Sequence, residues 1–547
     1  MKLLRVHIIS AETCGGLLDG LNVELRSPFD DYSSFDSFDP LCFIGPNGAG
    51  KSQFLQVIAE IFQSVFYACI GEEERDDGNP DLQFELEYLI YPEDDQLPVR
   101  VRISREAIGK KRPALKIERR EEYDWIECDL KARETRALLP DKIVGYTSGD
   151  NETLSIPFLI SRRGYAGDVA NAALYTAPHE RLIPDTRLML IDYGTHLEVL
   201  VANLLLGDIS QWDALLGDAK LRDLHSFRCI IQLAHNAAPN NPRKKEGSKR
   251  AKEVLLTPEL ENYLDQLKRC ATCYKYEDKT RTYTFDYWIN EQTRESFRFF
   301  WNSALNLYSS FHKFAMLNDL ALPKTERAFF QKNKSRKFAS RPPEPQDEDK
   351  VFRFERVRFL NQRTGKEVDY VSLSDGEHQL SQILSTFCML SSPNTLFLLD
   401  EPESHFNPQW RVQFISKILN LPTEDGDRRE ISRATKQDCL LTTHSPFVPS
   451  DMQKDKVFIF HKNEGIIEVK NPDIETFGAT FDTIIENCFD VRPPISQVSR
   501  DEIKELMASD DPEEIKAGIP RLGNSVEKAF LADRLRELTN RNSRDGV

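Results

Sequence analysis

The chain has 547 residues, which is too long for one compact domain and predicts about two or three hydrophobic cores. Its 40% hydrophobic and 29% charged residues are the balance of an ordinary globular protein, which excludes a disordered or fibrous chain. The net charge of −16 excludes a surface that is basic all over, so any contact with nucleic acid has to be local or made by a partner.

The sequence gives no sign of a membrane segment or an export signal. A membrane helix needs roughly 18 to 20 apolar residues, and the nearest run, at 197–207, is about half as long. The basic start "MKLLRVHIIS" resembles a signal peptide, but a histidine interrupts it and no small-residue cleavage site follows, so we expect a strand. The ten cysteines include one close pair, Cys270 and Cys273, without further zinc ligands nearby. We therefore expect reduced thiols and a cytoplasmic protein without membrane partners.

The N-terminal part, residues 1–160, is predicted to alternate strands with one long helix. Residues 1–62 predict a strand, a turn, a second strand, a glycine-rich loop and a helix whose apolar positions repeat at helical spacing. Apolar and alternating runs between residues 82 and 130 then predict an antiparallel sheet. A strand within 141–152 ends this part.

Long helical patterns, including one over 187–206, characterise residues 161–340, which we interpret as a mainly helical insertion with one short strand at 281–289. A basic loop at 241–252 interrupts it, and a charged, proline-bearing linker ends it at 331–350. Strands return over 351–475, and a helical interaction segment is predicted for 476–547.

The stretch "GPNGAGKS" fits the G-x-x-x-x-G-K-[ST] pattern of a phosphate-binding P-loop between a strand and a helix. Glycine lets successive N–H groups point at phosphates, the lysine reaches the terminal phosphates, and the serine hydroxyl ligates Mg²⁺. The predicted nucleotide-binding residues are Gly45, Pro46, Asn47, Gly48, Ala49, Gly50, Lys51 and Ser52, with Ser52 also a metal ligand. We therefore predict ATP and Mg²⁺ as cofactors.

Two further strands are predicted to end in catalytic side chains. The apolar run before "DEPES" ends in Asp400, placed to hold Mg²⁺ beside Ser52, and in Glu401, placed to activate the attacking water. An isolated acidic pair after a strand is more often a solvated loop, but a P-loop protein needs such acids. The strand in "CLLTTHSPF" ends in His444, which we expect to contact the γ-phosphate.

The stretch "LSDGE" forms an S-x-x-E capping box at the start of a predicted helix. Capping alone explains these residues, but a helix N-terminus also carries about half a positive charge with free N–H groups. Such a helix start can bind a second phosphate, so Ser374, Asp375, Gly376 and Glu377 are candidate residues of a second anion site.

Four motifs, taken in their order along the chain, resemble those of the ABC-type ATPase head of the SMC, RecF and OLD families: "GPNGAGKS", "LSDGE", "LLDEP" and "TTH". The resemblance covers residues 1–62 and 351–460. The resemblance implies an α/β fold, a mixed sheet with an antiparallel β subdomain. It also implies a homodimer or higher homo-oligomer in which the signature helix of one subunit caps the ATP of the other.

The sequence departs from the pattern of these families in two places. Asp375 replaces the first signature glycine, and Phe406 and Asn407 stand where relatives have leucine and histidine, so we expect slow or regulated hydrolysis. The candidate for the glutamine loop of the family is Asn151 in "GYTSGDNE".

The short insertion and small helical tail are similar to those of the PtuA family, the ATPases of Septu-type and retron-associated bacterial anti-phage systems. This resemblance implies a sensor and scaffold that controls a separate HNH nuclease of the PtuB type. A retron reverse transcriptase and its msDNA are further candidate partners. The chain would then contact nucleic acid through the complex with its partners. The tail lacks the acidic metal site of OLD nucleases, so we expect no nuclease activity in this chain.

Two other classes of function stay open. The basic stretches at 243–252 and 332–337 are compatible with a RecF-like DNA-repair ATPase that binds duplex DNA directly, although solvated loops in an acidic chain explain them better. A regulatory ATPase without any nuclease is the third class.

Overall fold

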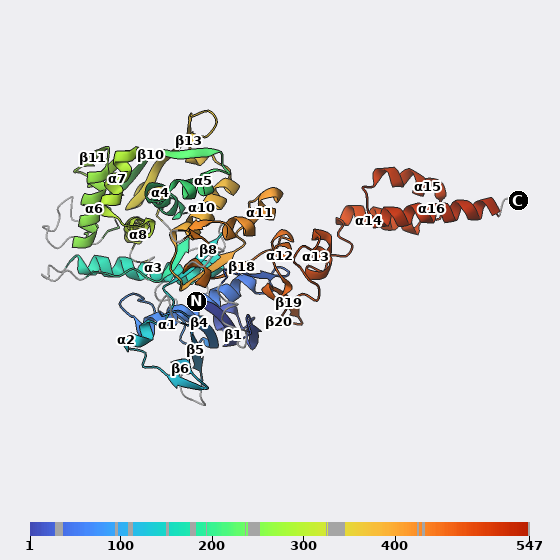
Figure 1. Cartoon of the computed structure of the whole chain (residues 1–547), viewed down its shortest axis with the longest axis horizontal. Helices are drawn as coiled ribbons and strands as arrows, with labels where there is room; N and C mark the ends of the chain where they lie inside the picture. Colours follow the sequence, from blue (N-terminus) through green and yellow to red (C-terminus); the bar gives the residue numbers. More distant parts are fainter. Residues whose placement is uncertain are drawn as a thin grey trace. The chain divides into compact units, whose positions relative to one another are not determined.

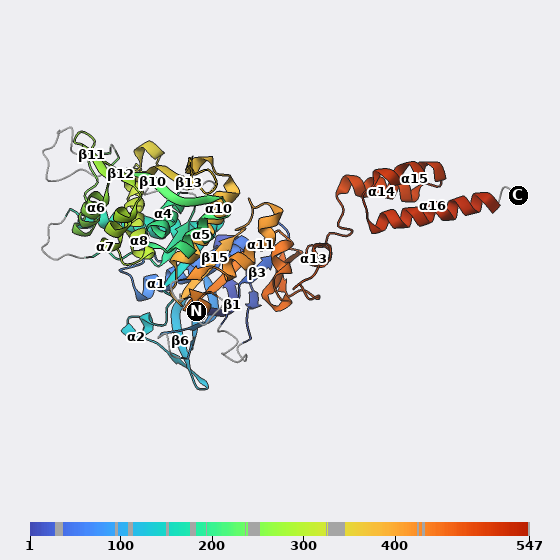
Figure 2. The same ribbon diagram turned by 45° about the horizontal axis from the view of Figure 1, so that its top comes forward.

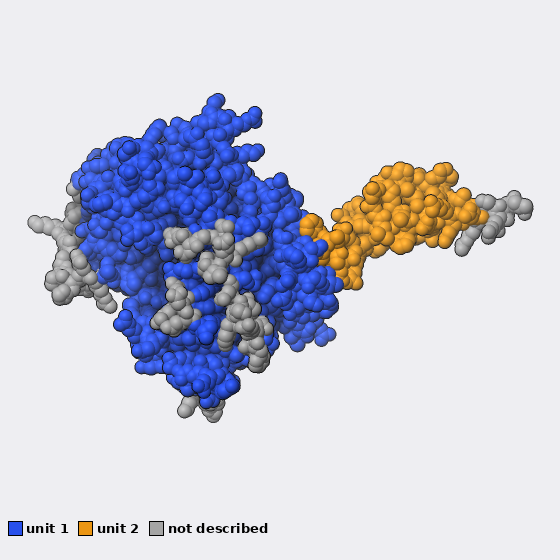
Figure 3. All heavy atoms as spheres, viewed as in Figure 1, with its two compact units in different colours: residues 1–478 blue, residues 479–547 orange. Residues whose placement is uncertain are grey.

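The computed structural model describes residues 1–27, 37–92, 97–107, 113–148, 152–174, 182–192, 194–235, 237–238, 252–323, 325, 345–423, 426–428 and 433–544. The chain divides into two compact units, residues 1–478 and 479–547 (Figure 3). The second unit begins at residue 479, where the sequence predicted a boundary at 476. Within the described ranges, no helix combines the length and apolar character needed to cross a membrane.

A seven-stranded sheet forms the centre of the first unit (Figure 1). Its strands are, in spatial order, β20 (Ile466–Lys470), β19 (Val457–Asn463), β3 (Leu41–Ile44), β18 (Asp438–Thr442), β15 (Thr395–Asp400), β8 (Lys142–Thr147) and β9 (Leu188–Ile191). All neighbours are parallel except β19 and β20. Strands β3, β15, β18 and β9 are buried along their whole length, as expected for parallel strands covered on both faces.

The predicted antiparallel sheet after the first long helix is confirmed. Its six strands are, in spatial order, β2 (Leu21–Glu24), β1 (Lys2–Ser10), β4 (Gln83–Ile90), β5 (Val99–Glu106), β6 (Ala114–Glu121) and β7 (Asp124–Glu127). Helix α1 (Lys51–Cys69) shares one hydrophobic core with this sheet and with the central sheet. That core holds α1, and therefore its N-terminal turn, firmly in place.

The expectation of a mainly helical insertion is wrong for three segments, which are strands: residues 188–191, 221–232 and 273–277. Residues 188–191 form strand β9 of the central sheet, and the helix predicted there, α4, begins only at His196. Residues 221–232 form the long strand β10, which pairs with β13 (Phe352–Asn361). Short, fully apolar runs have no periodicity that separates a buried strand from a helix, which explains the first error.

Strand β10 belongs to a third, five-stranded antiparallel sheet. The other strands are β11 (Cys273–Glu277), β12 (Thr282–Trp288), which was predicted, β13 and β14 (Glu367–Asp369). This sheet and the six-stranded sheet lie at opposite ends of the first unit (Figures 1 and 2). A two-stranded ribbon consists of β16 (Pro422–Thr423) and β17 (Gly426–Asp427).

Helices complete both units. Those of the first unit after α1 are α2 (Arg133–Arg136), α3 (Glu152–Ala172), α4 (His196–Leu206), α5 (Ile209–Leu216), α6 (Pro258–Cys270), α7 (Glu291–Phe300), α8 (Ala304–Met316), α10 (Asp375–Met389), α11 (Pro408–Leu419) and α12 (Phe447–Ser450). Those of the second unit are α13 (Phe481–Cys488), α14 (Gln497–Ala508), α15 (Pro512–Gly518) and α16 (Val526–Arg544). Ile503, Leu506, Ile515 and Leu531 form a separate core for the second unit.

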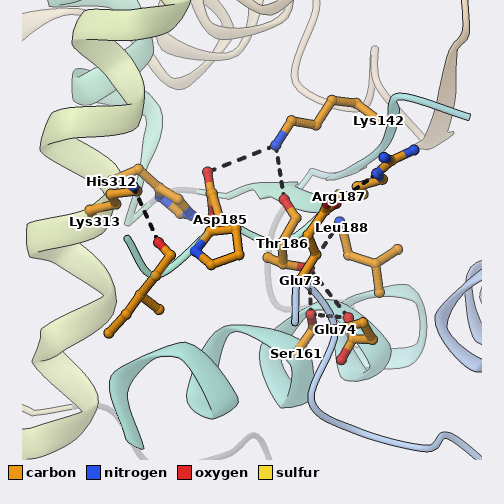
Figure 4. Close-up of polar contacts among 12 residues, drawn as sticks. Glu73, Glu74, Lys142, Ser161, Asp185, Thr186, Arg187, Leu188, His312 and Lys313 are labelled. Atoms are coloured by element: carbon orange, nitrogen blue, oxygen red, sulfur yellow. Dashed lines mark hydrogen bonds and ion pairs between the residues drawn. The ribbon is translucent and has the colours of Figure 1, made fainter. Parts of the chain in front are cut away.

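A buried polar cluster joins α3 and the segment before β9 to the rest of the first unit (Figure 4). The hydroxyl of Ser161 donates to Glu74 and lies 2.7 Å from the hydroxyl of Thr186. The ammonium of Lys142, on β8, donates to the Thr186 carbonyl at 2.8 Å. Burial raises the pKa of Glu74. Residues on both sides of the predicted boundary at 160 and 161 therefore share one buried network.

Candidate active site

The P-loop occupies the turn between β3 and α1, and its backbone requires glycine. Gly45 has φ of +140°, and a Cβ there would lie 2.4 Å from the carbonyl oxygen of Phe460 on β19. Gly48 and Gly50 have φ of +75° and +89°. Such values are unfavourable for residues with a side chain, so the loop can wrap only with these glycines. Pro46, Asn47 and Ala49 complete it.

Lys51 folds back over this loop. Its ammonium donates to the carbonyl oxygens of Gly45 at 2.9 Å and Pro46 at 3.2 Å, and lies 3.1 Å from Nε2 of His444. Burial lowers the pKa of Lys51 to about 8, although Glu401 and Asp400 oppose the shift. The Lys51 ammonium is thus held by neutral groups, which it can exchange for phosphate oxygens.

Ser52 and Asp400 meet at the carboxyl ends of the parallel strands. Oδ1 of Asp400 accepts hydrogen bonds from the hydroxyls of Ser52 at 2.8 Å and Thr442 at 2.6 Å. Asp400 and Thr442 are direct partners in the ladder between β15 and β18. Burial raises the pKa of Asp400. A hydroxyl and a carboxylate are hard oxygen ligands, so this pair fits Mg²⁺.

Glu401 and His444 lie beside this pair. Glu401 has φ of +49°, an uncommon conformation for a residue with a side chain, and its N–H donates to the Thr442 hydroxyl at 3.0 Å. Its Oε1 lies 3.4 Å from Nε2 of His444. The Glu401 side chain is 42% exposed, so water can reach it. Burial and the neighbouring Lys51 lower the pKa of His444, which keeps the imidazole neutral at neutral pH.

Sequence reasoning missed a second pair of contacts between the same two strand ends. Glu403 is 3% exposed and accepts a hydrogen bond from the hydroxyl of Thr443. The Thr443 hydroxyl in turn accepts from the N–H of Ser445 at 2.8 Å. Burial raises the pKa of Glu403 to about 7. The adjacent threonines of "TTH" were the only available signal, because their pairing depends on the sheet register.

The predicted capping box is present at the start of α10. The Ser374 N–H donates to Oε2 of Glu377 at 2.7 Å, and the Glu377 N–H donates to the Ser374 hydroxyl at 3.4 Å. Ser374 and Asp375 are exposed, whereas Gly376 is buried. A Cβ at Gly376 would lie 2.8 Å from the carbonyl oxygen of His405. The start of the helix is therefore exposed at Ser374 and Asp375, whereas His405 lies against its Gly376 side.

Two of the three residues that depart from the family pattern, Phe406 and Asn407, have structural roles. Phe406 is 3% exposed and packs edge-on against Trp410 and Phe414. The Asn407 side chain caps α11 by accepting from the Trp410 N–H at 2.9 Å. Asn151, the candidate for the glutamine loop, lies outside the described residues.

Residues 275–451 match the profile of a protein family described as "AAA domain, putative AbiEii toxin, Type IV TA system". The matched segment includes Ser374, Asp400, Glu401 and His444, while the P-loop precedes it. The match and the P-loop agree in indicating a P-loop ATPase domain. None of the curated proteins compared with the chain matches it.

Proposed function

We propose that this chain is an ATPase that binds ATP with Mg²⁺ and hydrolyses it. One observation carries the proposal. Five side chains from three distant parts of the sequence converge at one edge of the central sheet: Lys51, Ser52, Asp400, Glu401 and His444. A P-loop lysine and serine, a strand-end aspartate and a partly exposed glutamate are the groups that phosphoryl transfer to water requires.

Each side chain has a distinct task in this reaction. The N–H groups of the P-loop and the Lys51 ammonium bind the phosphates, and Ser52 with Asp400 would hold Mg²⁺. When bound, Mg²⁺ neutralises negative charge on the phosphate oxygens. Glu401 orients a water molecule and accepts its proton, since its carboxylate is exposed and its backbone is fixed by Thr442. Neutral His444 donates a hydrogen bond to the terminal phosphate.

We further propose that two copies of the chain bind ATP between them. The exposed N-terminus of α10 has the partial positive charge that suits a phosphate. Ser374, Asp375, Gly376 and Glu377 of one copy would then contact the nucleotide held by the P-loop of the other. The exposure of Ser374 and Asp375, at the start of an otherwise buried helix, supports this arrangement.

The biological setting is proposed to be a bacterial anti-phage system in which this ATPase controls a separate HNH nuclease. The description of the matched family as a toxin of a Type IV toxin–antitoxin system agrees with a role in defence. The second unit is our candidate for the nuclease docking site, because Val498, Val526 and Phe530 on its helices are 82%, 66% and 56% exposed. A retron reverse transcriptase with its msDNA is proposed as a partner of the insertion at residues 161–340.

Direct binding of duplex DNA receives no support of its own from the structure. Residues 241–251 of the first basic loop and all of the second, 332–337, lie outside the described residues.

The ATPase proposal is tested by comparing the wild type with Lys51→Ala and Glu401→Gln. We expect Lys51→Ala to lose nucleotide binding, because it removes the cation of the P-loop. We expect Glu401→Gln to bind ATP normally and to hydrolyse it at least about a hundredfold more slowly, as for loss of a general base. Binding is measured with a fluorescent ATP analogue and turnover by phosphate release. Normal hydrolysis by Glu401→Gln would remove this residue from the mechanism.

A further inference from the structure

Gln379 connects the N-terminus of α10 to the segment that follows Glu401. It lies one helical turn after Gly376, so the two residues are on the same face of the helix. Its amide Nε2 donates to the hydroxyl of Ser404 at 3.2 Å, and its Oε1 accepts from the N–H of His405 at 3.0 Å. The side chain is 4% exposed. Gln379 therefore fixes the position of residues 404 and 405 relative to the helix.

The segment from Glu401 to His405 is a tight turn that transmits this constraint to Glu401. The Ser404 N–H donates to the Glu401 carbonyl oxygen at 3.2 Å. Glu401 itself has the left-handed φ of +49° and is held on its other side by Thr442. Because the carbonyl of His405 also lies against Gly376, the helix and the turn cannot shift independently.

We infer that Gln379 is a positioning residue that couples the two nucleotide sites of a dimer. The inference rests on the proposed function. The N-terminus of α10 would contact the nucleotide of the second copy, whereas Glu401 serves the nucleotide of its own copy. A nucleotide bound by the second copy sets the position of α10, and through Gln379 and Ser404 it sets the position of Glu401. Each copy then hydrolyses ATP efficiently only when its partner has also bound ATP.

The test compares Gln379→Met with the matched variant Gln382→Met. Gln382 lies on the same helix and is 7% exposed, but its side chain donates to the Asp192 carbonyl at 2.8 Å instead of the turn. Both substitutions remove one buried amide of the same size from α10. Hydrolysis is measured over a range of ATP concentrations, and binding of a fluorescent ATP analogue is measured on the same samples.

We expect wild type and Gln382→Met to hydrolyse ATP cooperatively. In Gln379→Met, the Hill coefficient should fall to about 1, the value for independent sites, and kcat should fall about tenfold. Affinity for the ATP analogue at low protein concentration should stay unchanged. A merely structural role for Gln379 would lower kcat without changing the Hill coefficient, and that result would overturn the inference.

Ser404→Ala provides a second variant in case Gln379→Met does not fold. It removes one of the two hydrogen bonds of Gln379 and should also lower the Hill coefficient. If the wild type does not hydrolyse ATP, the proposed function fails. If the wild type hydrolyses ATP with a Hill coefficient of about 1, the proposed function stands and the coupling through Gln379 is refuted.

Discussion

Glu403→Gln should change how the stability of the protein depends on pH. The Glu403 carboxyl is buried, and burial raises its pKa from the ordinary 4.5 to about 7. Between these two values the folded state binds more protons than the unfolded state. The free energy of unfolding of the wild type therefore decreases as pH rises through this window, and the loss is nearly complete at about pH 8.

The magnitude follows from the same pKa. A displacement from 4.5 to about 7 corresponds to about 3 kcal/mol of stability lost between pH 5 and pH 8. Glutamine does not titrate, so Glu403→Gln lacks this loss. Any cost of burying the amide is the same at each pH and does not alter the slope. The Thr443 hydroxyl can still donate to the amide oxygen.

The measurement is urea-induced unfolding of both proteins at several values between pH 5 and pH 8. The difference in free energy of unfolding, variant minus wild type, should become more favourable to the variant by about 3 kcal/mol across this range. A difference that stays constant with pH would show that Glu403 is already ionised in the folded protein at pH 5. Our claim that burial raises the pKa of Glu403 would then be wrong.

One further substitution and one deletion follow from the fold. Gly45→Ala should weaken binding of the ATP analogue and destabilise the protein by about 1 to 3 kcal/mol, because the new Cβ meets the Phe460 carbonyl and φ becomes strained. Nucleotide binding is measured by fluorescence titration, and unchanged binding would contradict the P-loop geometry. Deletion of residues 479–547 should leave ATP hydrolysis intact, since the deleted unit has its own core. It should abolish co-purification of an HNH nuclease encoded beside this chain, and recovery of the nuclease with the truncated protein would refute docking through this unit.

The elements around the nucleotide site were predictable because each has a strong local signal. The P-loop requires glycine at fixed positions, and the run ending in Asp400 is apolar throughout, so strands β3 and β15 could be predicted. The capping box at Ser374 could be predicted from its own S-x-x-E pattern. The strand over 188–191 has four apolar residues and no periodicity, and its position in the central sheet comes from pairing with β8. Local patterns cannot predict such pairing.

The contacts between motifs could not be predicted either. Thr442 and Thr443 reach Asp400 and Glu403 only because β15 and β18 are parallel neighbours in a particular register. The hydrogen bonds of Gln379 likewise join residues that are in contact in the fold but 25 and 26 positions apart in the sequence. Such pairs depend on the tertiary fold rather than on spacing along the chain.

The central claim is that Ser374 of one copy serves the P-loop of another. Co-expression of Lys51→Ala and Ser374→Arg with two different affinity tags tests it most directly. Each variant alone should be inactive, while mixed assemblies purified through both tags should regain ATP hydrolysis, since one of their two sites combines an intact P-loop with an intact α10 N-terminus. Their rate should be about tenfold below that of the wild type, because the Lys51→Ala copy binds no ATP and cannot assist its partner. Inactive mixed assemblies, or none formed in the presence of ATP, would contradict the claim.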